Sequence, residues 1–325
     1  LHYYMAGNLR RILQKLFIWR LQIKEPEVII LGMDRMVMDN NDAKEREGVS
    51  PTYRKVNGFE LLQLNWGYYI IDAVFRGGSE HGNEGDTAKN MIKQGVVNIR
   101  ERYSKEVLII IRFDAGFFDE ELFRFCDEEL KIGFISGGKL YEDIKEYLND
   151  VVTEGDLKTY NGANNTWQYF EFEDRRKVWD EGIYYKVIYS GPLYEGKQML
   201  FEFARLEDII YTDVGMNKEL TVILSKAGKE EYLQAEKIIE TYHQRGADEL
   251  VNEGLKNFGT EQLPFKRFGS KSAYYYFMVI GFFLFECFKE DVANSVVDIH
   301  SYATTLRRRL IDIAGKVVHK AGRII

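Results

Sequence analysis

Residues 107–121, VLIIIRFDAGFFDEE, decide the fold class of this chain. The run Val107–Phe113 is almost wholly apolar, as expected for a strand in a sheet that is covered on both faces. Asp114 follows this strand directly, and Asp119 opens a predicted helix. Because ligands of open α/β sheets bind at the carboxyl ends of strands, Asp114 is a candidate functional residue. A turn or cap role is the alternative, but Asp119 is the better placed N-cap.

A second buried strand carries another acid. Residues 27–38 read EVIILGMDRMVM, and Asp34 interrupts their apolar run. Burial of a carboxylate is costly unless the group meets a cation or hydrogen-bond donors, so Asp34 is a second candidate. The alternative is a structural Asp that caps a turn at a strand end.

The order of the predicted elements suits an α/β fold of the RNase H-like class with a mixed sheet. Two strands, Phe59–Asn65 and Tyr68–Phe75, are predicted to pair as a hairpin around Trp66. The elements that follow are predicted as helix Asp86–Arg102, the strand before Asp114, a second helix, strand Lys131–Ser136 and a helix through Leu148.

The composition changes at about Val151. The segments WQYFEF, GIYYKVIYS, QMLFEFARLED and LTVILS have strand length and alternate or run apolar, with turns between them. Residues 151–225 are therefore predicted to be a mainly β insertion, followed by a helix over Lys229–Asn257. Ala273–Phe285 carries no charge but is short for a membrane span of about 20 residues, so it is predicted to be a core helix.

The segment Glu240–Lys256, ETYHQRGADELVNEGLK, gives the predicted helix a chemical face. On one continuous helix, steps of three, four and seven residues place Tyr242, Arg245, Glu249 and Lys256 in an arc about 60° wide. A solvated helix with an Arg–Glu pair is the alternative, and it would be preferred for any single pair. Four matched positions favour a functional face.

The spacing Tyr-x2-Arg-x3-Glu-x6-Lys resembles the signature of a group of bacterial DDE insertion-sequence transposases. Residues 28–48 and 107–121 resemble the first and second catalytic strands of that group. The amino-acid sequences of these two segments most resemble those of insertion-sequence family thirteen-eighty. The resemblance covers about residues 25–290. It implies a retroviral-integrase-like core that is interrupted by a β insertion before the last catalytic helix.

The resemblance also implies roles for the candidate residues. Asp34, Asp114 and Glu249 are the expected catalytic acids, and they would hold two Mg²⁺ or Mn²⁺ ions about 4 Å apart. The expected reaction is cleavage at transposon ends and joining of the 3′-hydroxyl to target DNA. The residues expected to bind DNA phosphates beside the scissile bond are Tyr242, Arg245 and Lys256.

The expected partners are the terminal inverted repeats of the transposon and target DNA, bound by a homodimer, with no membrane partner. Five segments are predicted: a basic helical segment at 1–26, a first part of the catalytic core at 27–150, the β insertion at 151–225, the last part of the core at 226–290, and basic helices at 291–325. Relatives of this kind carry a DNA-binding region upstream of the first catalytic strand. Because the chain starts abruptly, we expect residues 1–26 to be a remnant of that region.

The net charge of −7 argues against a simple DNA-coating protein, but the charge is unevenly distributed. Residues 1–24 and residues 300–325 each carry a net charge of +5, which leaves −17 for the middle of the chain. Basic ends can bind phosphates, and an acidic centre suits bound cations. Solvated basic helices are an equally good explanation when the charges are considered alone.

The two cysteines and five scattered histidines form no disulfide framework and no zinc motif, which fits a reducing, cytoplasmic location. Three functions remain open from the sequence. The first is an active DDE transposase core, and the second is a truncated DNA-binding remnant without activity. The third is an RNase H-like nuclease that cuts DNA without joining it.

Overall fold

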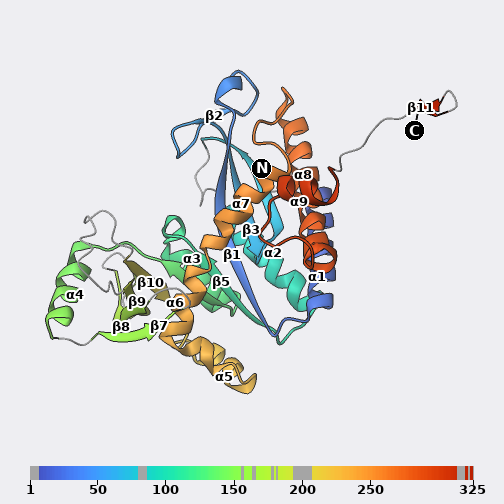
Figure 1. The fold of residues 1–325 in the computed structure, drawn as a ribbon. Coiled ribbons are helices and arrows are strands. Elements are labelled where there is room, and N and C mark those ends of the chain that lie inside the picture. Colours follow the sequence, from blue (N-terminus) through green and yellow to red (C-terminus); the bar gives the residue numbers. More distant parts are fainter. Residues whose placement is uncertain are drawn as a thin grey trace.

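The computed structural model describes residues 7–79, 86–154, 157–162, 166–176, 179–180, 182–192, 207–312, 319–320 and 323–324. Ten strands form one mixed sheet, against which the helices pack (Figure 1). The strands are β1 Val28–Asp39, β2 Ser50–Pro51, β3 Asn57–Trp66, β4 Tyr69–Gly77, β5 Leu108–Phe113, β6 Gly133–Gly137, β7 Lys158–Asn161, β8 Thr166–Asp174, β9 Tyr185–Pro192 and β10 Asp208–Thr212.

The centre of the sheet is parallel and both flanks are antiparallel. Strands β1, β5 and β6 are parallel neighbours. On one side, β3 pairs antiparallel with β1, and β4 pairs antiparallel with β3. On the other side, β10, β9, β8 and β7 continue the sheet from β6 through antiparallel pairs. The fold is therefore a mixed α/β fold.

Helices cover both faces of the central sheet. The α-helices of the described residues are α1 Gly7–Lys24, α2 Thr87–Arg102, α3 Glu120–Arg124, α4 Glu142–Glu154, α5 Lys218–Lys226, α6 Ala235–His243, α7 Gly246–Phe258, α8 Phe268–Phe288 and α9 Ala303–Leu310. Gly95 of α2 packs on Leu64, whereas Asp248 of α7 lies against Gly32. Since Leu64 pairs with Met33, and neighbouring residues of a strand face opposite ways, α2 and α7 lie on opposite faces.

Strand β5 shows why the sheet needs both helix layers. All six of its residues are buried. Ile109 and Ile111 belong to the larger apolar core, whereas Leu108 and Ile110 belong to a second core with residues of α5 and α6. Period-two alternation of large apolar side chains thus supplies both cores from one strand.

The strands and helices predicted before residue 150 are confirmed, with shifts of a few residues at their ends. The predicted strand LTVILS at 220–225 is wrong, because these residues lie in helix α5. Asn217 caps this helix, and its Oδ1 accepts a hydrogen bond from the backbone N–H of Leu220 at 3.0 Å. Such an N-cap favours a helix over a strand at an otherwise ambiguous apolar run.

The predicted β insertion does contain strands β7 to β10, but they extend the central sheet, because β10 pairs with β6. Most of the predicted strand at 198–208 lies outside the described residues. In the C-terminal segment, the described residues form α9 and then two short strands, β11 His319–Lys320 and β12 Arg323–Ile324, where helix was predicted.

Helix α8 confirms the predicted core helix, since Tyr275, Val279 and Phe283 on it are fully or almost fully buried. Across the described part of the chain, no helix has both the length and the apolar character that crossing a membrane requires.

Candidate active site

Asp34 lies on β1, and Asp114 directly follows the adjacent parallel strand β5. Met33 of β1 pairs with Phe113 of β5. Each of these two residues is followed in sequence by one of the acids, Asp34 or Asp114. Neighbouring strands are about 4.8 Å apart, which makes the two carboxylates near neighbours. Asp34 lies inside β1, five residues before its end at Asp39, so the alternative of a turn cap at a strand end is wrong.

Hydrogen bonds hold the half-buried Asp34 carboxylate in place. Its Oδ1 accepts from the backbone N–H of Arg35 at 2.8 Å, and its Oδ2 accepts from Nδ2 of Asn252 in α7 at 2.7 Å. Burial raises the pKa of Asp34, and the charge of Asp114 raises it further. The two hydrogen bonds and Arg245 act in the opposite direction without cancelling the shift. The pair therefore concentrates negative charge that a cation would stabilise.

Asp114 begins a tight turn, and its Oδ1 accepts a hydrogen bond from the backbone N–H of Gly116 at 2.9 Å. A Cβ atom at Gly116 would lie 2.6 Å from Nη2 of Arg35 and 3.0 Å from Oδ1 of Asp114. A side chain at Gly116 would therefore displace the end of the Arg35 side chain, whose guanidinium approaches the second acid here. Arg35 also lies 3.5 Å from the buried Glu60 and stacks 4.8 Å from the ring centre of Tyr53.

The prediction of one helix through Tyr242 and Lys256 is wrong. Helix α6 ends at His243 and α7 begins at Gly246. The backbone N–H of Arg245 bonds the carbonyl of Tyr242, and that of Asp248 bonds the carbonyl of Arg245, both at 2.9 Å. These bonds reach back three residues instead of four, and Gly246 adds little helix propensity, so the chain turns more tightly there. The predicted 60° arc does not exist.

Tyr242 and Arg245 remain beside the acids despite the break. Tyr242 is buried, and a side chain at Gly137 would collide with its hydroxyl and approach the backbone nitrogen of Ala115 to 3.2 Å. The Arg245 guanidinium stacks 5.7 Å from the centre of the Tyr242 ring. Burial acts to lower the pKa of Arg245, but Tyr242 and the three predicted acids raise it overall.

Glu249 and Lys256 occupy other places on α7. Glu249 is exposed on its first turn and acts electrostatically on Arg245 and on Arg54. Lys256 lies two turns further along, where it forms ion pairs with Glu261 at 2.9 Å and with Glu253 at 3.6 Å. Glu261 in turn accepts a hydrogen bond from the backbone N–H of Asp39, at the far end of β1. Lys256 is thus held away from the acid pair.

A buried ion pair fixes α7 to the sheet. Nη2 of Arg112 in β5 donates to Oδ2 of Asp248 at 3.0 Å, and Nη1 donates to the carbonyl oxygen of Thr241 at 3.0 Å. Burial raises the pKa of Asp248 to about 6, against the lowering effect of Arg112. Asp248 therefore holds α7 on the sheet through its ion pair with Arg112, and the neighbouring Glu249 is exposed to solvent.

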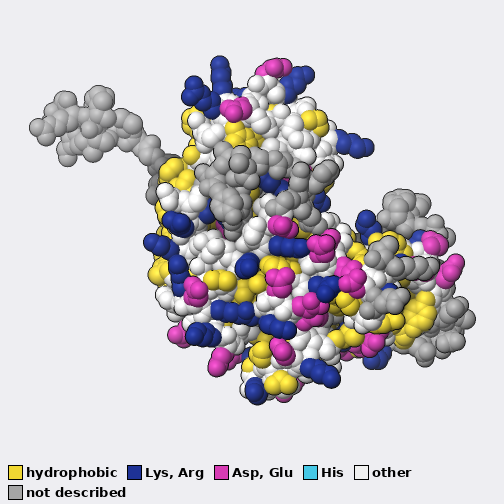
Figure 2. Space-filling model, turned by 180° about the vertical axis from the view of Figure 1, so that it is seen from behind, with side chains coloured by type: hydrophobic (Ala, Val, Ile, Leu, Met, Phe, Trp, Pro, Cys, Tyr) yellow, Lys and Arg dark blue, Asp and Glu magenta, His cyan; other side chains and the backbone are white. Residues whose placement is uncertain are grey.

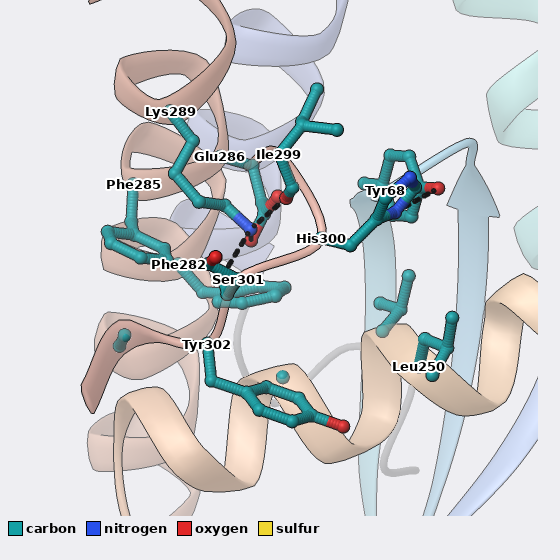
Figure 3. Close-up of a pocket in the computed structure, with 13 residues that line it drawn as sticks. Tyr68, Leu250, Phe282, Phe285, Glu286, Lys289, Ile299, His300, Ser301 and Tyr302 are labelled. Atoms are coloured by element: carbon teal, nitrogen blue, oxygen red, sulfur yellow. Dashed lines mark hydrogen bonds and ion pairs between the residues drawn. The ribbon is translucent and has the colours of Figure 1, made fainter. Parts of the chain in front are cut away.

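The other side of α7 packs against α8 and the segment 299–303 around a small pocket of about 30 Å³ (Figure 3). Leu250 of α7 and Phe282 of α8 face this space. Lys289 donates to the carbonyl oxygens of Ile299 and Ser301, at 2.9 and 3.2 Å. The residues around this pocket pack against α7, and none of the three predicted acids lines it.

Several residues near the acids went unnoticed in the sequence. Asn252 follows Glu249 by three positions and Arg35 follows Asp34 directly, so their places were visible but their contacts were not. The loop between β2 and β3 brings Tyr53 and Arg54 to the site. The hydrogen bond to Tyr53 is the main cause that raises the pKa of Arg54, and the charges of Asp34 and Glu249 raise it further. No local pattern marks this loop.

The donor chemistry of the acid pair fits a hard divalent cation, because Asp34 and Asp114 are carboxylates on adjacent strands and Asp34 is destabilised by its neighbour's charge. Glu249 is not part of that pair. Within the described residues, no three Asp, Glu, His or Cys side chains are grouped so that they could hold one metal ion.

Comparison with known proteins places the chain among transposases. A solved structure titled as the piggyBac transposase synaptic complex with hairpin DNA is similar, with a TM-score of 0.31 and 10% sequence identity. The match covers 86% of this chain and spans 61% of that one. No curated protein matches. The family model described as transposase DDE domain group 1 matches residues 6–325, and the chain therefore belongs to this DDE transposase family.

Proposed function

We propose that this chain is a catalytically active transposase of the Tyr-Arg-Glu-Lys group, of the kind found in insertion-sequence family thirteen-eighty. Its reaction is metal-dependent cleavage at transposon ends, followed by joining of the 3′-hydroxyl to target DNA. The observation that carries the proposal is the adjacency of Asp34 and Asp114 on parallel strands, in a chain that belongs to a DDE transposase family.

The sheet supports an RNase H-like core within this proposal. The order β4, β3, β1, β5, β6 combines an antiparallel hairpin on one side of β1 with two parallel strands on the other. Asp34 and Asp114 lie where the parallel pairing of β1 and β5 ends, which is where open α/β sheets bind ligands.

In this proposal Asp34 and Asp114 hold a divalent cation, Mg²⁺ or Mn²⁺, and Glu249 completes the acid set from α7. A cation bound there would activate the attacking hydroxyl and stabilise the leaving oxygen in an in-line displacement at phosphorus. Asn252 and the backbone N–H of Arg35 orient Asp34, so the first acid is preorganised by hydrogen bonds.

The basic and aromatic residues around the pair would bind the DNA backbone. The guanidinium of Arg245 stacks on the Tyr242 ring and interacts electrostatically with the acids, so it would bind a phosphate beside the scissile bond. The ring of Tyr242 would hold that guanidinium in position by stacking against it. Lys256 would exchange its ion pair with Glu261 for a phosphate further along the strand. The substrates would be transposon ends and target DNA, handled by a homodimer.

The test is nicking and strand transfer on a DNA fragment that carries the element's own ends, with Mn²⁺ or Mg²⁺. Glu249→Gln is the diagnostic variant. Glu253→Gln is its matched control, because it makes the same substitution at another exposed residue, one turn along the same helix. We expect joined products from the wild-type chain and from Glu253→Gln, and none from Glu249→Gln.

Other outcomes have defined meanings. Cutting without joining would support the RNase H-like nuclease. Metal-independent DNA binding without either reaction would support the DNA-binding remnant. Joined products that survive Glu249→Gln would remove Glu249 from the site while leaving the transposase assignment in place.

A further inference from the structure

Helices α1 and α2 enclose a polar cleft of about 420 Å³ on the sheet face opposite α7. Residues of α1 and α2 line it: Gly7, Arg10, Arg11, Gln14, Lys15, Gln94, Asn98 and Arg102. The candidate acids lie on or beside strands β1 and β5 and on α7, and none of them lines this cleft. It is a separate feature of the molecule.

The floor of the cleft is electrically compensated. Arg10 and Asp72 of β4 are both buried and form an ion pair, in which Nε of Arg10 donates to Oδ1 of Asp72 at 2.7 Å. Nε2 of Gln14 donates to Oδ2 of Asp72 at 3.3 Å. Nδ2 of Asn98 donates to Oε1 of Gln14 at 3.2 Å, so the network ties α1, α2 and β4 together. The cleft is therefore built on a rigid base.

The rim is positively charged. Arg11, Lys15 and Arg102 are exposed, and the described residues that line the cleft include no Asp or Glu. Since Asp72 compensates Arg10, the three rim cations give the cleft a net charge of about +3. Arg11 and Lys15 are four residues apart on α1, and Arg102 approaches from α2, so the charges surround the opening from two sides.

This charge is local. The chain carries −7 overall, and Figure 2 shows Lys and Arg side chains interspersed with Asp and Glu over the face seen from behind. Some exposed cations elsewhere are paired, as Lys145 is with Glu142 and Lys158 with Glu171. Apart from Gly7, the described residues that line the cleft are cations and neutral amides, so the cleft is suited to a polyanion, whose oxygens both kinds of side chain can bind.

We propose that the cleft between α1 and α2 binds the phosphodiester backbone of duplex DNA, on a segment distinct from the one held at Asp34 and Asp114. The identity of the polyanion rests on the proposed function. The distinct segment follows from the sheet, since Asp72 under the cleft and Asp34 at the acid pair face opposite sides of it. Because phosphates are the same at every position of a duplex, we expect binding through them to be independent of DNA sequence.

The first experiment measures binding of a random-sequence duplex to the full chain at several salt concentrations. The diagnostic variant is Arg11→Gln/Lys15→Gln/Arg102→Gln. The control, Lys93→Gln/Lys218→Gln/Lys226→Gln, removes the same number of exposed charges outside the cleft. We expect the diagnostic variant to lower the slope of log K against log salt by about 0.9 for each lost phosphate contact, up to about 3 in all. The control should change it little.

The second experiment places a cysteine in the cleft. Gln94 is exposed in the cleft, so the variant Gln94→Cys presents a thiol there, whereas the native Cys126 and Cys287 are buried. This thiol should cross-link to a duplex that carries thiol-reactive groups on its phosphates. Ser225→Cys, exposed on α5, should not. The cross-link does not depend on removing any charge.

The outcomes separate this inference from the proposed function. A wild-type chain that cuts transposon ends, with an unchanged salt slope in the cleft variant and no cross-link at residue 94, would overturn the cleft assignment alone. A wild-type chain that neither binds duplex DNA nor cuts it would overturn both.

Discussion

Two aspartates of the same sheet show how one sheet separates structural charge from functional charge. Asp72 of β4 is two strands from Asp34 of β1, which is about 10 Å, and the two side chains face opposite sides of the sheet. Asp72 is 2% exposed and forms an ion pair with the buried Arg10. Asp34 is half-buried, and the residue that follows Phe113 at the end of the adjacent strand β5 is another acid, Asp114.

The difference is in compensation. At Asp72 the protein itself supplies the opposite charge, so the pair holds α1 on the sheet. At Asp34 the hydrogen-bond donors are neutral, and the charge of Arg245 lowers the pKa of Asp34 without cancelling the increase caused by burial and by Asp114. An acid pair whose negative charge is only partly compensated, at the end of parallel strands, is expected to be retained for binding a cation.

The largest expected effect comes from Asp34→Asn. If the acid pair is functional, this change should lower cleavage and joining at least about a thousand-fold, because the cation loses one of its charged ligands. The unfolding free energy should be unchanged or higher, since a repulsive charge has been removed. Strand-transfer assays and urea unfolding of the same preparation would measure both. A large loss of stability would place Asp34 in the structural class with Asp72.

The second effect should be found at Asp72. Asp72→Asn should lower the unfolding free energy by about 3 kcal/mol, because the buried Arg10 then loses the charge of Asp72. Strand transfer per folded molecule should persist at low temperature. Arg10→Leu/Asp72→Leu should be more stable than Asp72→Asn, since neither charge then remains buried. Equal stability of Asp72→Asn and the wild type would show that the pair is not structural.

The third effect tests burial without pairing, at Asp213. Burial raises the pKa of Asp213 to about 8, and the charge of Asp127 adds to the shift. Protonation is thus favoured in the folded state, so the stabilisation is complete below pH 4 and is lost as the pH rises towards 8. The loss should approach about 1.4 kcal/mol for each pH unit in this window.

Urea unfolding at pH 5 and at pH 8 would measure this term. Asp213→Asn should remove it, and the exposed Asp42→Asn should leave it intact. If wild type and Asp213→Asn showed the same dependence on pH, Asp213 would be ionised in the folded chain and its burial would not decide its charge.

Much of the fold could be predicted from local patterns. The apolar run before Asp114, the hairpin at Trp66 and the helix over α2 were confirmed because period and turn residues agree there. Helix α5 was missed, because a short apolar run does not distinguish strand from helix and Asn217 as a cap went unused. The break between α6 and α7 was missed for a similar reason, since spacing along a helix assumes that the helix is continuous.

The sequence by itself determined the family pattern, the two strands that carry Asp34 and Asp114, and the order of the elements around them, since hydrophobic periodicity and chain order are local properties. Only the tertiary structure decided which charges are compensated. It brought Asn252 to Asp34, Arg112 to Asp248 and Arg10 to Asp72. These partners are up to 218 residues apart in the chain. Contacts of that range depend on strand register and helix packing, which no local pattern specifies.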